Sequence, residues 1–286
     1  MRVDDFDVSS SAYTLHDAAC EDGRSSYTDP ETGYHVFTAL GLAARGRCCG
    51  SGCRHCPYDH EAVPVDARAE RIRQPAWLNE GVAPTEPVDV LFWSGGKDSF
   101  LTWRALQREA KRPTVLATTF DVARRTIAHQ EIRVEQVVRQ AKTLGAPLIG
   151  IPLAPGLDYV ERVTSGVAIV PVIQRFVFGD LHLEHIRRWR IDALGTLAAT
   201  RGASLHFPLW GVPYGILLTD LEASGVECEV SAVTEDGSGA VSVGDVFDRA
   251  LIARLPEHMD AFGENGEFHT LAKVWTGTTL KPRSLG

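Results

Sequence analysis

The fold is decided by the stretch Val88-Asp89-Val90-Leu91-Phe92-Trp93-Ser94-Gly95-Gly96-Lys97-Asp98-Ser99. Its beginning, from Val88 to Trp93, is mostly apolar and predicts a short buried strand. A glycine turn follows, and the residues from about Asp98 to Ala110 predict a helix. Backbone amides at the start of a helix have no intrahelical partner and attract anions. The order of strand, glycine loop and helix therefore predicts a loop that binds the phosphates of a nucleotide.

Each residue type in this loop suits phosphate binding. The glycines let the backbone approach an anion closely, the serines donate from hydroxyls, and the lysine brings a mobile positive charge. The aspartate would be repelled by bare phosphate, so it either caps the helix or holds Mg²⁺ between phosphates. The spacing is not that of the Walker loop. The simpler alternative is a glycine turn with a helix cap. The predicted nucleotide-binding residues of the loop are Ser94, Gly95, Gly96, Lys97, Asp98 and Ser99.

Strands and helices alternate after the loop. This order predicts an α/β fold with a parallel sheet and helices on both faces, and ligands on such sheets bind at the carboxyl ends of the strands. Beyond Trp210 the pattern changes to a smaller α+β subdomain that we expect to fold over the nucleotide edge. The expected strands are 88–93, 114–120, 148–151, 175–179 and 227–233, and the expected helices are 98–110, 130–144, 158 onward, 182–200 and 214–223.

Residues at two strand ends are further candidates for nucleotide binding. Phe120 and Asp121 end the second strand, where Asp121 either faces the adenosine or is a turn aspartate. Gly179 and Asp180 end the fourth strand of the alternation. Asp180 either reaches Mg²⁺ or substrate, or caps the helix that begins near His182.

The chain of 286 residues has room for about two domains. We expect a cysteine-rich module at 1–60, a linker at 61–87, a nucleotide-binding domain at 88–205 and a substrate subdomain at 206–286. Residues 27–38 predict a β-hairpin, because Asp-Pro-Glu-Thr-Gly supplies turn residues between aromatic and β-branched ones. The linker has room for one short helix, from Val65 to Arg73.

Charge and hydropathy exclude some classes of protein. The net charge of −8 argues against a broad surface for nucleic acid, although Arg187-Arg188-Trp189-Arg190 offers one local basic patch or an ordinary solvated helix face. Trp189 and Trp210 are expected in the core. No apolar run approaches the ~18 residues of a membrane span, and the acidic start resembles no secretory signal. We therefore expect a cytoplasmic protein without a membrane partner.

Four cysteines lie within nine residues, in Cys48-Cys49-Gly50-Ser51-Gly52-Cys53-Arg54-His55-Cys56. In a reducing compartment such a cluster is typical of metal binding or redox chemistry. Cys49, Cys53 and Cys56 have C-x3-C-x2-C spacing, and Cys48, His55 or His60 can complete four ligands for zinc or an iron–sulfur cluster. Cys48 can also stay free, and an unmetallated thiol cluster is the simpler alternative. The module resembles a small cysteine-rich domain of unknown role, found alone or fused to other domains.

The phosphate loop resembles that of the PP-loop ATP pyrophosphatases, the adenine nucleotide alpha-hydrolase-like enzymes. The resemblance implies cleavage of ATP between the α- and β-phosphates and adenylylation of an acceptor oxygen. Gly263-Glu264-Asn265-Gly266-Glu267-Phe268-His269-Thr270 is similar to the C-terminal signature of the diphthine–ammonia ligase family. Phe178-Gly179-Asp180-Leu181 and Phe207-Pro208-Leu209-Trp210 match the same family in the same order.

This resemblance implies a ligase that uses ATP, Mg²⁺ and ammonia to amidate a carboxylate of a small molecule or protein. Its catalytic residues would be Lys97 and Asp98 with Glu264, Glu267 and His269. The two glutamates can hold Mg²⁺, orient an amine or accept its proton, and the histidine can act as base or donor. The alternative for Gly263–Thr270 is a polar turn before the last strand.

One departure from the family concerns the substrate. Diphthine ligases carry a Gly-Ala-Ile stretch followed by Tyr-Gln-Arg, whereas this chain has Gly179-Asp180-Leu181-His182 followed by Arg187-Arg188-Trp189. It resembles the bacterial branch, so the acceptor is left open. Two other functions remain: thiolation of tRNA with the cysteines delivering sulfur, and a nucleotide sensor without catalysis.

Overall fold

The computed structural model describes residues 10–29, 34–58, 60–64, 74–79, 84–109, 112–122, 124–127, 130–153 and 156–277, with side chains from 15 onward. The chain divides into two compact units. The smaller one comprises 1–74 with 121–125, and the larger one comprises 75–120 with 126–286.

The larger unit is built on a mixed sheet that is dominated by parallel pairs. β4 pairs in parallel with β5 and β7, and β7 pairs in parallel with β8. The exception is β3, which runs antiparallel to β6 at the sheet's edge. The order of the strands is β3 (Ala76–Trp77), β6 (Leu148–Leu153), β5 (Thr114–Asp121), β4 (Val88–Phe92), β7 (Ile173–Val177) and β8 (Ser204–His206). The α/β class with a parallel sheet is thus confirmed.

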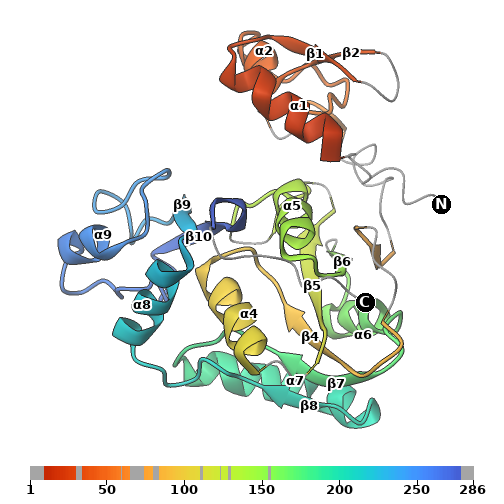
Figure 1. The fold of residues 1–286 in the computed structure, drawn as a ribbon, viewed down its shortest axis with the longest axis vertical. Helices are drawn as coiled ribbons and strands as arrows, with labels where there is room; N and C mark the ends of the chain where they lie inside the picture. The colour runs from red at the N-terminus through yellow and green to blue at the C-terminus, as the bar shows by residue number, and fades with distance from the viewer. Residues whose placement is uncertain are drawn as a thin grey trace. The chain divides into compact units, whose positions relative to one another are not determined.

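Helices flank the strands, as Figure 1 shows. Side chains of alternate strand residues, such as Val90 and Phe176, pack with Val163 and Leu194 in one buried cluster. These contacts place α6 and α7 on one face of the sheet, and the period of two along a strand explains why every second residue joins them. The helices of this part are α4 (Lys97–Glu109), α5 (Val134–Leu144), α6 (Tyr159–Val167) and α7 (Glu184–Thr200).

The predicted elements agree with the structure within a few residues, except at the start of α5. This helix begins at Val134 and not at Gln130. Arg133 is the N-cap residue, and its amide donates to Oε1 of Gln136 at 2.9 Å, while Glu131 adopts a positive φ of 51°. A residue in that region of φ cannot continue a right-handed helix. The predicted linker also contributes β3, for which two residues gave no periodic signal.

The C-terminal part brings a second sheet to the phosphate loop. β9 (Glu227–Val233) and β10 (Phe268–Lys273) pair in antiparallel fashion, and α8 (Tyr214–Ser224) and α9 (Arg249–Arg254) accompany them. A short 3-10 helix, η2 (Val274–Thr276), follows β10. The amide of Ala272 in β10 donates to the carbonyl oxygen of Gly95 at 2.9 Å. The last strand therefore lies directly against the phosphate loop.

Gln140 ties three segments of the larger unit together. Its side chain is fully buried. Its Oε1 accepts from the Trp93 indole at 2.8 Å, and its Nε2 donates to the carbonyl oxygens of Gly95 at 2.8 Å and Ala272 at 2.7 Å. One amide on α5 thus fixes the end of β4, the loop after it and β10.

The described part of the smaller unit consists of two helices and a two-stranded hairpin. Its elements are α1 (Ser10–Glu21), β1 (Ser26–Thr28), β2 (His35–Phe37) and α2 (Ala39–Ala43). β1 and β2 form the predicted hairpin, whose turn at 30–33 lies outside the described residues, as does the predicted helix from Val65 to Arg73. Ala19 and Tyr27 are the buried members of one cluster, with Val36 packed against them.

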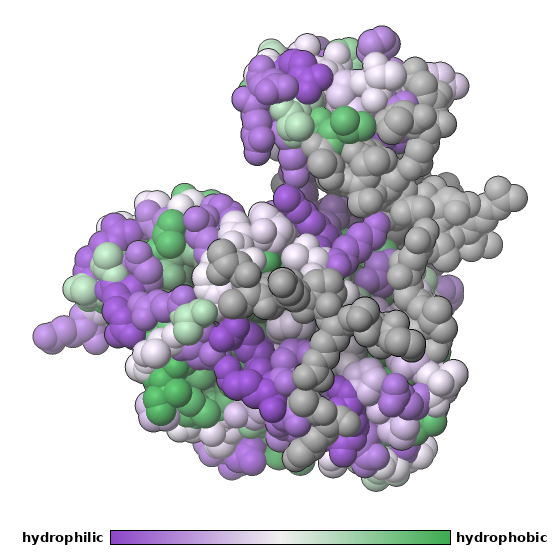
Figure 2. Space-filling model, viewed as in Figure 1, coloured by the Kyte–Doolittle hydropathy of each residue, from purple (hydrophilic) through white to green (hydrophobic). Residues whose placement is uncertain are grey.

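Hydrophilic residues cover most of the face drawn in Figure 2, with smaller hydrophobic patches between them. In the part of the chain that the structure describes, no helix is both long and apolar enough to cross a bilayer.

Replacing Gln140 by Leu tests its role. The slightly smaller apolar side chain would leave the buried Trp93 N–H and the two carbonyl oxygens without this partner, which costs about 2–3 kcal/mol of stability. Urea unfolding followed by far-UV circular dichroism measures the change. Gln107→Leu, an exposed change on α4, should shift stability by less than about 0.5 kcal/mol, and equal effects of the two changes would contradict the role of Gln140.

Candidate functional site

The phosphate loop has the backbone conformation that its glycines predict. Gly95 has a φ of +86°, which favours glycine. The amide of Phe100 bonds the carbonyl oxygen of Gly96 and begins the helical pattern of α4. Of the amides before it, Gly96 N bonds its neighbour Ser94 Oγ at 3.3 Å and Lys97 N bonds Thr270 Oγ1 at 3.1 Å. These hydroxyl partners are ones that an anion can replace.

Gly96 is required by close packing. A Cβ atom there would lie 2.9 Å from the carbonyl oxygen of Thr270 and 3.2 Å from Oε1 of Gln130. The loop backbone is therefore in contact with β10 and with the segment before α5. Sequence reasoning missed Gln130 and Thr270 as loop neighbours, since only the fold brings them there.

Lys97 is a buried cation at the start of α4, with 4% of its side chain exposed. Its Nζ donates to Asp98 Oδ2 at 2.9 Å and lies 5.4 and 5.3 Å from the ring centroids of Phe247 and Phe262. Burial would lower the pKa of Lys97, but the charges of Asp98 and Glu264 outweigh it and raise that pKa. The lysine thus remains charged where phosphates are expected.

Asp98 has one oxygen without a partner. Oδ2 is bonded to Lys97, whereas Oδ1 is buried and no described residue forms a hydrogen bond with it. Burial raises the pKa of Asp98, Lys97 lowers it, and Asp180 adds a smaller rise. A buried, unsatisfied carboxylate oxygen is the hard donor that Mg²⁺ prefers.

Glu264 is placed among like charges. Burial raises its pKa to about 8, with a further rise from Asp98, a reduction from Lys97 and smaller rises from Asp260 and Asp180. A carboxyl group of this kind exchanges its proton near neutral pH. The structure therefore brings Glu264 together with the predicted residues of the phosphate loop and with Asp180.

Glu267 has a different environment from Glu264. It is buried, and its Oε1 accepts from the amide of Asp260 at 2.8 Å and from Asn265 Nδ2 at 3.2 Å. Its Oε2 is buried and has no hydrogen-bond partner among the described residues. These contacts brace the turn from Asp260 to Glu267.

Sequence reasoning missed two residues that stabilise this turn, namely Tyr214 on α8 and Asp260 at the start of the turn. Tyr214 donates to the carboxylate of Asp260, at 3.0 Å from Oδ1 and 2.9 Å from Oδ2, and its ring stacks on Phe262. Asp260 Oδ1 accepts from the amides of Phe262 at 2.8 Å and Glu264 at 3.1 Å. Burial raises the pKa of Tyr214, as does Asp260. Neither residue belongs to a local motif that would single it out.

His269 and Asp180 each contact a polar neighbour. His269 Nδ1 lies 3.4 Å from Nε2 of Gln130. Asp180 accepts from Arg190 at 2.7 and 3.3 Å, and the N-cap position of α7 is Leu183. The capping alternative for Asp180 is therefore wrong.

The other strand-end candidates are closely packed. A Cβ atom on Gly179 would lie 2.9 Å from Thr102 Oγ1 and 3.0 Å from the carbonyl oxygen of Asp98, so β7 ends against the first turn of α4. Phe120 is buried. Asp121 Oδ1 accepts from the amide of Arg124 at 2.7 Å, which is the turn geometry.

Two tryptophans, one on α7 and one near it, are more exposed than expected. Trp189, expected in the core, is 46% exposed. Trp210 is half-buried, and the Arg187 guanidinium lies 4.6 Å from its ring centroid. The spacing along α7 cannot tell a core tryptophan from one at the rim of the helix.

The four clustered cysteines of the smaller unit form two contacting pairs. Cys49 Sγ lies 3.2 Å from Cys53 Sγ, and Cys48 Sγ lies 3.8 Å from Cys56 Sγ. Hydrogen bonds from Ser51 lower the pKa of Cys49 to about 7. Within the described ranges no group of three or more metal-binding side chains is already gathered around one point. The thiolate metal site stays a prediction.

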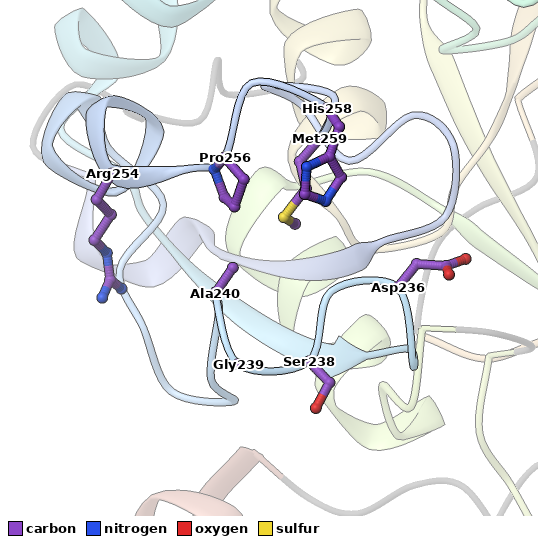
Figure 3. A pocket seen from close by; sticks show the side chains of 8 residues that line it. All are labelled: Asp236, Ser238, Gly239, Ala240, Arg254, Pro256, His258 and Met259. Carbon is purple, nitrogen blue, oxygen red and sulfur yellow. The ribbon is translucent and has the colours of Figure 1, made fainter.

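A separate hollow of about 440 Å³ lies between the turn after β9 and the segment after α9. Figure 3 shows Pro256 and Met259 pointing toward Ala240 across it. None of the predicted site residues lines it. Its lining consists of Asp236, Ser238, Gly239, Ala240, Arg254, Pro256, His258 and Met259.

Two comparisons with known proteins bear on the chain. Residues 15–62 match a family of unknown function (DUF5522), a match that spans the clustered cysteines. The chain is also similar to a solved structure described as a predicted subunit of tRNA methyltransferase from Methanocaldococcus jannaschii. That similarity has 19% sequence identity and a TM-score of 0.32, and covers 50% of this chain and 78% of the other.

The environment of Glu264 predicts a pH-dependent effect of Glu264→Gln. Folding raises the pKa of this carboxyl from 4.5 to about 8, so the folded state binds the proton more tightly than the unfolded state does. The stability of the protein therefore falls as the pH rises from 4.5 to about 8. Since one pKa unit corresponds to about 1.4 kcal/mol, the neutral variant should exceed the wild type by at least about 1 kcal/mol at pH 9. Denaturant unfolding at pH 5, 7 and 9 measures this. Glu235→Gln, at an exposed turn, is the control, and an advantage of Glu264→Gln that does not grow with pH would refute the assignment.

Proposed function

We propose that the protein is an ATP-dependent ligase that forms AMP and pyrophosphate, adenylylates a carboxylate and amidates it with ammonia. The observation that carries the proposal is the buried, charged Lys97 on a glycine loop at the start of α4, facing Asp98 and Glu264. A buried ammonium at a helix N-terminus suits a polyanion. The nearby carboxylates suit a cation and a proton acceptor.

The loop would bind the β- and γ-phosphates of ATP. The amides of Gly96 and Lys97, which now bond Ser94 Oγ and Thr270 Oγ1, would turn to phosphate oxygens. The two hydroxyls would then be free to donate to the same anion.

Mg²⁺ would fit the unsatisfied Oδ1 of Asp98, with Asp180 a further carboxylate candidate because its charge acts on Asp98. The ion would supply charge neutralisation for the triphosphate. Asp180 is held by Arg190, which fixes its direction but also competes for its oxygens.

The reaction would take place in two displacements. A carboxylate oxygen of the acceptor attacks the α-phosphorus, and the bond to the β-phosphate oxygen breaks, so pyrophosphate leaves. Ammonia then attacks the acyl carbon, and AMP leaves with the former carboxylate oxygen. Lys97 and the loop amides stabilise the charge that develops on pyrophosphate.

Glu264 would accept the proton that the attacking nitrogen loses. Its pKa of about 8 suits a base that works near neutral pH. Asp260 and Tyr214 would act by positioning, since they hold the amide of Glu264 and the turn that carries it. Glu267 braces the same turn from within.

Oxygen tracing tests this function. The enzyme is incubated with Mg²⁺-ATP, ¹⁵N-ammonium and a panel of ¹⁸O-labelled carboxylic acids, and the products are analysed by mass spectrometry. The proposal expects AMP that carries one ¹⁸O and an amide that carries ¹⁵N. ADP as the sole nucleotide product would refute the ligase mechanism, and tight ATP binding without turnover over the whole panel would favour a nucleotide sensor.

Lys97→Met should impair both binding of ATP and its turnover. Loss of one oriented cation from the leaving group typically lowers the rate by about 10²–10³-fold, so AMP formation should fall by that factor. Isothermal titration with ATP and a pyrophosphate-release assay measure the two effects. Lys142→Met, at an exposed position on α5, should leave both within about twofold of the wild type, and a Lys97→Met protein that retains wild-type turnover would exclude this loop as the phosphate site.

A further inference from the structure

Cysteines contribute to the described core of the smaller unit. Among its described residues, one buried cluster contains Ala19 and Tyr27, another contains Cys48, Cys56 and Val63, and Leu42 is also buried. Natural domains below about 70–80 residues commonly add disulfides or a structural metal to a small core. Two of the three buried residues in the second cluster are cysteines.

The distances between sulfur atoms suit a tetrahedral metal site. With metal–sulfur bonds of about 2.3 Å, the edge of a tetrahedron of four sulfurs measures about 3.8 Å. Cys48 Sγ and Cys56 Sγ are 3.8 Å apart, which is one such edge. Cys49 Sγ and Cys53 Sγ are 3.2 Å apart and would have to open by about half an ångström. Neither distance is that of a disulfide, whose sulfurs are about 2.05 Å apart.

The histidines of the module are held by other partners. His55 Nε2 lies 2.8 Å from the Tyr27 hydroxyl, and its ring stacks on His16 with centroids 3.8 Å apart. His60 Nε2 lies 2.8 Å from the carbonyl oxygen of Cys53. His16 Nε2 accepts from the amide of Ala39 at 3.1 Å. These histidine nitrogens thus have polar partners, whereas the four sulfurs contact one another in pairs.

We propose that Cys48, Cys49, Cys53 and Cys56 together bind one thiophilic metal ion, for which zinc has the fitting geometry. The ion would draw the two pairs of sulfurs together. Gly50 and Gly52, with φ of +72° and +66°, let the short chain between them turn. The site lies within the smaller unit and does not depend on the proposed ligase function.

Metal analysis of the full-length chain, purified anaerobically without added metal, tests the site. The expected result is about one zinc per chain, no visible absorption, and four thiols that become reactive only after chelation. Replacing zinc by Co²⁺ should give the sulfur-to-cobalt charge-transfer bands of four thiolates. The unit should also become sensitive to protease when the metal is removed, because metal binding supplies part of its folding free energy.

Cys56→Ser and the exposed Cys49→Ser should each lower the metal content to less than about a tenth of the wild type. Cys20→Ser is the matched control, because Cys20 lies in the same unit beside His16 and outside the four thiols. Cys49→Ser keeps the test valid if Cys56→Ser does not fold. A wild-type chain with no metal and two disulfides would overturn the proposal, and so would iron with acid-labile sulfide, or metal retained in both variants.

Discussion

The carbonyl oxygen of Gly95 is the point on which the site depends. It accepts from the amide of Ala272 in β10 and from the side chain of Gln140 on α5. The Gly95 carbonyl shares a peptide plane with the Gly96 amide, so these two bonds also orient the amide that precedes α4. The same contact places Thr270 beside Lys97. β10, whose Thr270 lies 173 residues beyond Lys97, therefore completes the loop, and the turn before that strand carries Glu264.

The charges around Lys97 determine which form of the nucleotide fits. Asp98, Asp260 and Asp180 each raise the pKa of Glu264, Lys97 lowers it, and Arg190 pairs with Asp180. A bare triphosphate would add to this excess of negative charge. A triphosphate that carries Mg²⁺ would not, and an ammonium ion would be attracted. Under the proposed function, the electrostatics of the site would favour a metal-bound nucleotide and a cationic or amine second substrate.

The sequence predicted those features that depend on neighbours in the chain. The apolar run before Ser94 and the glycines after it set the strand and the loop, and both lie where expected. Glu264 and Glu267 look alike in sequence, yet one is surrounded by carboxylates and the other bonds the amide of Asp260. That difference depends on how the turn folds. β3, Tyr214 and Asp260 gave no local signal for the same reason, since their roles come from partners distant in sequence.

The two units differ in the residues that form their buried clusters, and this difference bears on the role of the clustered cysteines. The larger unit buries whole strands and helix faces, so loss of one side chain there leaves the rest of the core in place. In the described part of the smaller unit, Cys48 and Cys56 are two of the three buried residues of one cluster. A metal bound by these thiols would add its binding free energy to the stability of the unit, because the unfolded chain rarely holds a preformed site. Such a structural role for the thiols would be independent of any reaction in the larger unit.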